Sequence, residues 1–123
     1  MYNQKQYILE KEVYYQALWM VRQYPALKAE YADLVHSSPA LDGQPRSTDP
    51  GDPTGEAAAR AAAVSAKIRI IEGALSRIPG EYRAGLLQNI IDREPYPSIA
   101  NRSTWKVWRR RLIYFVARGA GMI

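Results

Sequence analysis

The segment DPTGEAAARAAAVSAKIRIIEGALSRIPG, residues 52–80, constrains the architecture of the whole chain. Asp52 stands at an N-cap position, Pro53 at the first helical position and Pro79-Gly80 at the far end, which together predict a long helix over 53–80. This helix carries apolar residues at alternating spacings of four and three, namely Ala57, Ala61, Val64, Ile68, Ile71, Leu75 and Ile78. The resulting apolar seam runs along about seven turns and needs another long helix to cover it.

The first 36 residues form the segment of sufficient length to cover this seam. Tyr7, Tyr14 and Leu18 fall on one helical stripe, and Pro25 predicts a kink or a short break in the N-terminal helical segment. Two pairings stay open, an antiparallel pair within one chain or a coiled coil between chains. Residues 37–52 are rich in Pro, Gly, Ser and Asp and are expected to form a linker.

Two further helices are expected after the Pro79-Gly80 break. Residues 81–93 form a short amphipathic helix, and the last helix runs from Ser103 to Arg118. Pro95 and Pro97 leave at most one turn in the connector between them. The fold class predicted from these segments is all-α, with a long helical hairpin preceding a small C-terminal unit.

The positive charge of the chain is concentrated in its last quarter. The net charge is +5, yet residues 1–92 hold 10 Lys and Arg against 11 Asp and Glu, whereas residues 93–123 hold 7 against 1. A basic segment of this kind attracts polyanions. The pattern therefore favours nucleic acid as a partner.

The last helix divides into an apolar side and a basic side. At 100° per residue, the side expected to face inward consists of Trp105, Trp108, Leu112, Phe115 and Val116. The opposite side carries Ser103, Lys106, Arg110 and Ala117, flanked by Arg109, Val107 and Tyr114. Short polar and long cationic side chains on the first two turns suit a helix that enters the major groove of DNA. Arg111 points elsewhere and is expected to pack along the surface or to pair with an acid such as Asp92 or Glu94.

The residue types argue against catalysis and against a bound cofactor. The chain has no cysteine and a single histidine, His36, so a thiolate site, a histidine-based triad or a two-histidine metal site cannot be built in one chain. Asp42, Asp49 and Asp52 lack the spacing of a calcium loop, and no phosphate-cradling loop is present. We therefore expect no enzymatic activity, no metal and no cofactor. No stretch has the length of a membrane span or a signal peptide, which makes the cytoplasm the expected location.

Three segments of the chain resemble phage-encoded transcriptional regulators of the RinA and ArpU type. They are GQPRSTDPGDPTGEAA (43–58), IPGEYRAGLLQNII (78–91) and STWKVWRRRLIYFVARGAGMI (103–123). The C-terminal part of these regulators is similar to the promoter-recognition domain of sigma factors. The resemblance therefore implies a helix-turn-helix-like DNA-binding unit over 81–123.

The resemblance also implies a function and a set of site residues. It implies a regulator in the bacterial cytoplasm, an activator of late or packaging genes that binds double-stranded DNA and, as a further partner, RNA polymerase. Base edges would be contacted by Ser103, Thr104, Lys106, Val107 and Arg110, and phosphates by Arg102 and Arg109.

An alternative is a helical interaction protein that assembles through its long helices. It would be a homo-oligomer, such as a phage packaging component, or an adaptor for RNA polymerase. The exposed parts of the N-terminal tyrosines would then form the partner surface, since tyrosine is enriched at protein interfaces.

Overall fold

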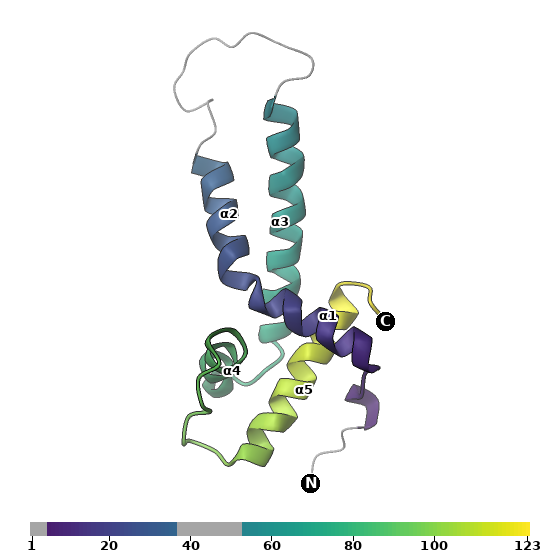
Figure 1. The fold of residues 1–123 in the computed structure, drawn as a ribbon, viewed down its shortest axis with the longest axis vertical. Coiled ribbons are helices and arrows are strands. Elements are labelled where there is room, and N and C mark those ends of the chain that lie inside the picture. Colours follow the sequence, from purple (N-terminus) through teal and green to yellow (C-terminus); the bar gives the residue numbers. More distant parts are fainter. Residues whose placement is uncertain (1–4, 37–52) are drawn as a thin grey trace.

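The fold was analysed in a computed structural model that describes residues 5–36 and 53–123 (Figure 1). This part of the chain is entirely helical and contains no strand, which confirms the all-α prediction. In chain order its elements are η1 (Lys5–Tyr7), α1 (Lys11–Arg22), α2 (Tyr24–His36), α3 (Pro53–Leu75), α4 (Gly80–Asp92) and α5 (Arg102–Gly119). The expected linker 37–52 and the Asp52 cap lie outside the described residues.

The molecule consists of a two-helix arm and a helical base (Figure 1). α2 and α3 lie side by side and run in opposite directions in the arm, while α1, α4 and α5 pack together at the foot of α3. One hydrophobic core connects the two parts. The N-terminal end of α5 lies at the end of the molecule away from the arm (Figure 1). Within the described residues, no helix has both the length and the apolar character to cross a membrane.

The apolar seam of α3 is buried most deeply where its side chains are largest. Val64, Ile71, Leu75 and Ile78 are almost fully buried, whereas the small residues near the start of the helix are partly exposed. α2 covers the seam within the same chain. The helix ends at Leu75, earlier than the predicted residue 80, because the backbone tightens there into turns closed by Arg77 N–H to Ala74 O and Ile78 N–H to Leu75 O. Gly80 instead begins α4.

The N-terminal helical segment is broken one residue before Tyr24, as the position of Pro25 predicts. Pro25 has no N–H to donate, and its ring would clash with the carbonyl of Val21 in a continuous helix. α1 therefore ends at Arg22, and α2 takes a new direction with Pro25 in its first turn. As a result α2 pairs with α3, while α1 crosses to α5. The sequence predicts a helix from residue 4, but α1 begins at Lys11 and the short 3-10 helix η1 precedes it.

Polar contacts fix both halves of this broken segment. The hydroxyl of Tyr24 donates to Glu72 at 2.6 Å, and burial together with this bond raises the pKa of Tyr24 to about 12. Arg22 Nε donates to the carbonyl of Ile90 near the end of α4, at 3.0 Å. Higher on the arm, Arg60 pairs with Glu30. These contacts join α2 to α3 and α1 to α4.

Trp105 anchors α5 to the rest of the base. Its indole is fully buried, stacks on the ring of Tyr96 at 5.4 Å and meets the ring of Tyr82 edge-on at 5.0 Å. Its Nε1 donates to the carbonyl of Pro97 at 2.9 Å, which satisfies the polar end of the ring. Gly85 lets the indole approach α4, since a Cβ there would lie 2.5 Å from the ring edge. The inward orientation expected for Trp105 is therefore confirmed.

We expect Gly85→Ala to destabilise the fold by about 1–3 kcal/mol, because the new methyl group would displace the indole or the ring of Pro97. The free energy of unfolding in urea measures this change. Gly73→Ala is the matched control: it lies inside α3 with nothing within 4 Å of the new Cβ, and it should stabilise by about 0.5–1 kcal/mol through helix propensity. Equal effects of the two substitutions would contradict the role assigned to Gly85.

Candidate nucleic-acid interface

α5 begins with a side-chain cap that fixes its first turn. Asn101 Oδ1 accepts hydrogen bonds from the backbone N–H of Thr104 at 2.9 Å and from its hydroxyl at 3.0 Å. This is the arrangement that stabilises a helix N-terminus. The cap directs the side chains of the following two turns, where the basic residues of the chain are concentrated.

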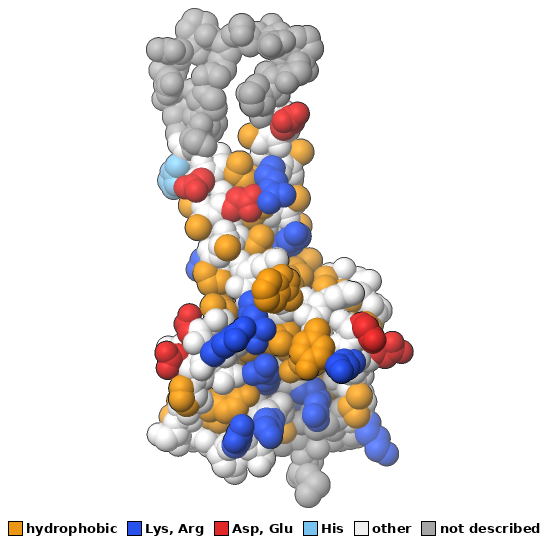
Figure 2. All heavy atoms as spheres, in the orientation of Figure 1, with side chains coloured by type: hydrophobic (Ala, Val, Ile, Leu, Met, Phe, Trp, Pro, Cys, Tyr) orange, Lys and Arg blue, Asp and Glu red, His pale blue; other side chains and the backbone are white. Residues whose placement is uncertain are grey.

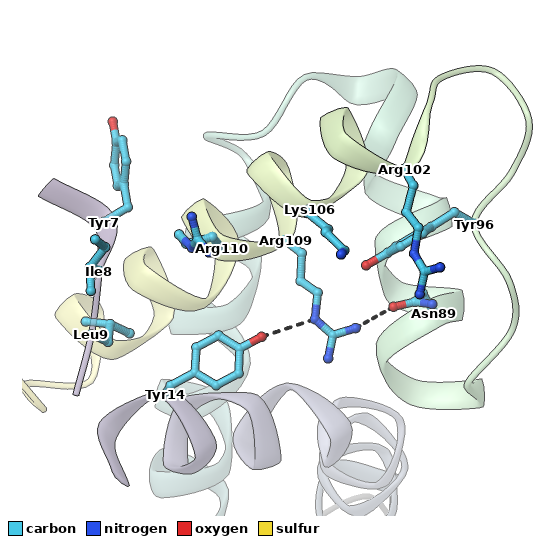
Figure 3. Close-up of a pocket in the computed structure, with 10 residues that line it drawn as sticks. All are labelled: Tyr7, Ile8, Leu9, Tyr14, Asn89, Tyr96, Arg102, Lys106, Arg109 and Arg110. Carbon is cyan, nitrogen blue, oxygen red and sulfur yellow. Dashed lines mark hydrogen bonds between the residues drawn. The ribbon is translucent and has the colours of Figure 1, made fainter. Parts of the chain in front are cut away.

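A groove lies beside these two turns, bounded by α5, α1, α4, the connector that follows α4, and the segment from η1 to Leu9 (Figure 3). It encloses about 690 Å³. We call it the basic groove and define it by Tyr7, Ile8, Leu9, Tyr14, Asn89, Tyr96, Arg102, Lys106, Arg109 and Arg110. In Figure 3, Arg102, Lys106 and Arg109 extend from α5 into the space bounded by Tyr14 and Asn89. Cationic, phenolic and amide groups thus converge on one open cavity.

Arg109 is held in the wall of the basic groove. Its Nε donates to the hydroxyl of Tyr14 at 3.2 Å, and its Nη1 donates to Asn89 Oδ1 at 2.5 Å. Burial disfavours the charge of this half-buried guanidinium, but hydrogen bonds to Tyr14 and Tyr96 outweigh that cost and raise its pKa. Arg109 therefore keeps a full positive charge at a fixed position. The groups that hold it, the Tyr14 hydroxyl and the Asn89 amide, are neutral.

The charge of the groove is not balanced from within. Its described lining includes four cationic residues and neither Asp nor Glu. Arg102, Lys106 and Arg110 are exposed to solvent. Figure 2 shows the same imbalance over a wider area, since Lys and Arg side chains spread over the lower half of the visible face while Asp and Glu lie at its margins and on the arm. Such a surface attracts anions.

The seven predicted site residues separate into two groups. Arg102, Lys106, Arg109 and Arg110 come together in the basic groove. The other three do not line it: Ser103 is exposed, Val107 is half-buried and the hydroxyl of Thr104 is bonded to the Asn101 cap. The structure thus collects the cations in one place and leaves the short side chains outside it.

The buried side of α5 is rotated by roughly a fifth of a turn from the predicted one. Trp105, Leu112 and Val116 are buried as expected, but Trp108 and Phe115 are partly exposed. Ile113 and Ala117 are buried in their place. Of these two residues, Ala117 was predicted to lie on the outer side. The reason is that α5 packs against α1 as well as against α3 and α4.

η1 covers part of the side of α5 that was predicted to be open. The ring of Tyr7 meets the rings of Tyr114 and Phe115 edge-on, at 5.2 Å and 5.9 Å. Arg111 was expected to pack along the surface or to pair with an acid such as Asp92 or Glu94, and its guanidinium lies over the rings of Tyr7 and Trp108, at 4.6 Å and 5.1 Å. The outer side of α5 is therefore open mainly along its N-terminal half.

Sequence reasoning did not assign Tyr14, Asn89 and Tyr96 to the site. Tyr14 and Arg109 are 95 positions apart, and no local pattern links a tyrosine of the first helix with an arginine of the last. Among the described residues, no group of three or more His, Asp or Glu is placed to hold a metal ion. The acidic residues Asp42, Asp49 and Asp52 lie outside them.

Comparison with protein-family models, with curated proteins and with solved structures finds no match to this chain.

We expect Arg109→Met to destabilise the fold by about 1–3 kcal/mol, because Asn89 Oδ1 and the Tyr14 hydroxyl would lose their donor in a half-buried wall. Methionine keeps most of the apolar stem and removes the charge. Arg110→Met is the matched control and should change the free energy of unfolding by about 0.5 kcal/mol or less, because Arg110 is exposed. Urea denaturation of both variants measures the difference. Arg109→Met with wild-type stability would show that these bonds do not hold the groove together.

Proposed function

We propose that this protein is a DNA-binding regulator of transcription rather than an enzyme. The observation that carries the proposal is the convergence of Arg102, Lys106, Arg109 and Arg110 on one open groove with no acidic residue in its described lining. Four cations held close together repel one another, which destabilises the site, and a bound polyanion removes this repulsion. Phosphate oxygens are the acceptors that such a set of donors suits.

In this proposal the N-terminal half of α5 faces a DNA duplex. Arg102 and Arg109 contact phosphates at the groove, whereas Lys106 and Arg110 reach from it toward base edges. Ser103 and Val107 lie on the adjoining side of the same turns and make further contacts with base edges. The hydroxyl of Thr104 is bonded to Asn101, the N-cap of α5, and contacts a base only if it leaves that bond. The free N–H groups and dipole of the α5 N-terminus add attraction for a phosphate.

The biological setting of this proposal comes from the resemblance to the RinA and ArpU regulators. It is that of a phage or prophage protein in the cytoplasm of a bacterial host, which activates late or packaging genes together with RNA polymerase. α4 and α5 would form the helix-turn-helix-like unit. The connector 93–101 contains turns and no helix, so the unit would be a shortened form of that motif.

The test compares DNA binding by charge-matched variants. Lys106→Ala and Arg110→Ala should each weaken binding to duplex DNA from the region flanking the gene by about 1–3 kcal/mol, and log affinity should fall linearly with log salt. Lys67→Ala removes the same charge from the exposed side of α3 and should have little effect. Fluorescence anisotropy at several salt concentrations measures all three. Equal losses from Lys67→Ala and Lys106→Ala would argue against a site on α5, and equal affinity for flanking and random-sequence duplexes would argue against sequence recognition.

A second candidate function is assembly, and a specific surface of α1 favours it. Tyr15 and Trp19 lie one turn apart and are 56% and 59% exposed. Together with Met122 they border a shallow apolar surface flanked by Lys11 and Glu12. Exposed aromatic rings of this size are enriched at protein interfaces. The occupant we propose for this function is a second copy of the chain.

Light scattering tests this second candidate. If α1 mediates self-association, the wild-type chain should have a mass above that of one chain, and Tyr15→Ser combined with Trp19→Ser should reduce it to the monomer mass. Tyr31→Ser, which changes an exposed tyrosine on α2, should leave the mass unchanged. A wild-type chain that stays monomeric over the accessible concentration range would rule out this function.

A further inference from the structure

A second group of basic residues lies on another side of α5, along its contact with α3. Two shallow cavities of about 320 Å³ and 490 Å³ follow each other there. Arg77 and Phe115 line both of them, so the two cavities form one continuous surface. We call its basic residues the arginine strip: Arg69, Arg77, Arg83, Arg111 and Arg118.

The arginine strip is separate from the basic groove. The two surfaces share Tyr7 as a lining residue and no cation. At 100° per residue, Arg111 and Arg118 leave α5 on the side roughly opposite to Arg102 and Lys106. A straight duplex bound at the groove therefore cannot reach the strip at the same time.

Neutral groups orient the arginines of the strip. Arg69 Nη2 donates to Ser65 Oγ at 3.2 Å, and Arg118 Nη1 donates to the hydroxyl of Tyr114 at 3.1 Å. The guanidinium of Arg77 lies 4.6 Å from the centre of the Phe115 ring. These contacts position the three side chains without neutralising them, because none of the contacts involves a carboxylate.

Arg83 adds a fourth positioned cation to the strip. Its Nε donates to the carbonyl of Ile78 at 2.8 Å, and its Nη2 donates to that of Ser76 at 3.3 Å. The described lining of both cavities contains no Asp or Glu. Among the described residues that line these two cavities, no acid opposes the positive potential of the strip.

The form of the strip indicates an extended ligand rather than a single small anion. Arg69 lies in α3, and Arg77 lies two residues beyond the end of that helix, in the turns that follow Leu75. At a helical rise, the eight positions between them span about 12 Å. One strand of a B-form duplex carries three to four phosphates over roughly that axial distance. Guanidinium forks bind phosphate oxygens through paired hydrogen bonds, and side chains already ordered lose little entropy on binding.

From this geometry we propose that the arginine strip binds the phosphate backbone of a second DNA duplex, independently of its sequence. The protein then holds two duplex segments, one on each side of α5. The proposal rests on the proposed function in so far as the ligand is DNA. The strip supplies affinity without base recognition, whereas the groove supplies the contacts that read bases.

The experiment measures how many short duplexes of random sequence bind to each chain. The wild-type protein should bind two, and the triple variant Arg69→Gln, Arg77→Gln, Arg118→Gln should bind one at the salt concentration that fills both wild-type sites. At low salt, the residual binding of the variant at the strip should have a slope of log affinity against log salt smaller than the wild-type slope by two to three. The matched control changes three exposed lysines away from both surfaces, Lys11→Gln, Lys28→Gln and Lys67→Gln, and should still bind two. Circular dichroism verifies that the variants remain helical, and Arg118→Gln alone, an exposed position, should lower the slope by about one.

The outcomes separate this inference from the proposed function. A wild-type chain that binds a single duplex and keeps its salt slope in the triple variant overturns the arginine strip and leaves the groove intact. If Lys106→Ala with Arg110→Ala changes nothing while the triple variant loses a duplex, the groove is overturned and the strip stands. Equal losses in the triple variant and the lysine control would reduce the effect to net charge and overturn the strip.

Discussion

The burial of one indole determines how α5 presents its charges. Trp105 is held on three sides, by the ring of Tyr96, by the ring of Tyr82 and by the close approach to Gly85, while Pro97 accepts its N–H. A helix fixed at that point cannot rotate without breaking aromatic contacts and leaving a buried donor unsatisfied. Because neighbouring residues follow at 100° steps, the same anchor points Lys106 and Arg109 toward α1. The short connector between α4 and α5 is therefore part of the anchor as well as a link.

Two arginines of the base, Arg109 and Arg118, have hydrogen bonds to neutral side chains. Arg109 rests on Tyr14 and Asn89, and Arg118 on Tyr114, whereas the ion pair of Arg60 with Glu30 lies far away on the arm. Hydrogen bonds to hydroxyl and amide oxygens order a guanidinium without cancelling its field. The uneven distribution of charge along the sequence thus produces an uneven distribution in space. The arm has nearly equal numbers of basic and acidic residues, whereas the base has an excess of basic residues. This division supports both the proposed site on α5 and the proposed strip beside α3.

The elements that could be predicted from the sequence are those with strong local signals. The seam of α3, the break at Pro25 and the inward side chain of Trp105 follow from periodicity and from proline chemistry, and the structure contains all three. The places of Ile113 and Ala117 could not be predicted, because they depend on α1 crossing to α5, a contact between the two ends of the chain. The same applies to the site. Its cations are visible as a run of basic residues, but Tyr14 and Asn89 join them through tertiary packing alone.

The contact between Tyr14 and Arg109 has a consequence for the order of events during folding. One wall of the groove belongs to α1 and the other to α5, so residues 95 positions apart must come together before the groove exists. Contacts of such long sequence separation form late, after the loop-closure entropy between them has been lost. During folding, the side of α1 that packs on α5 therefore stays uncovered until this late contact forms. The groove depends on the complete tertiary fold and cannot form from either helix alone.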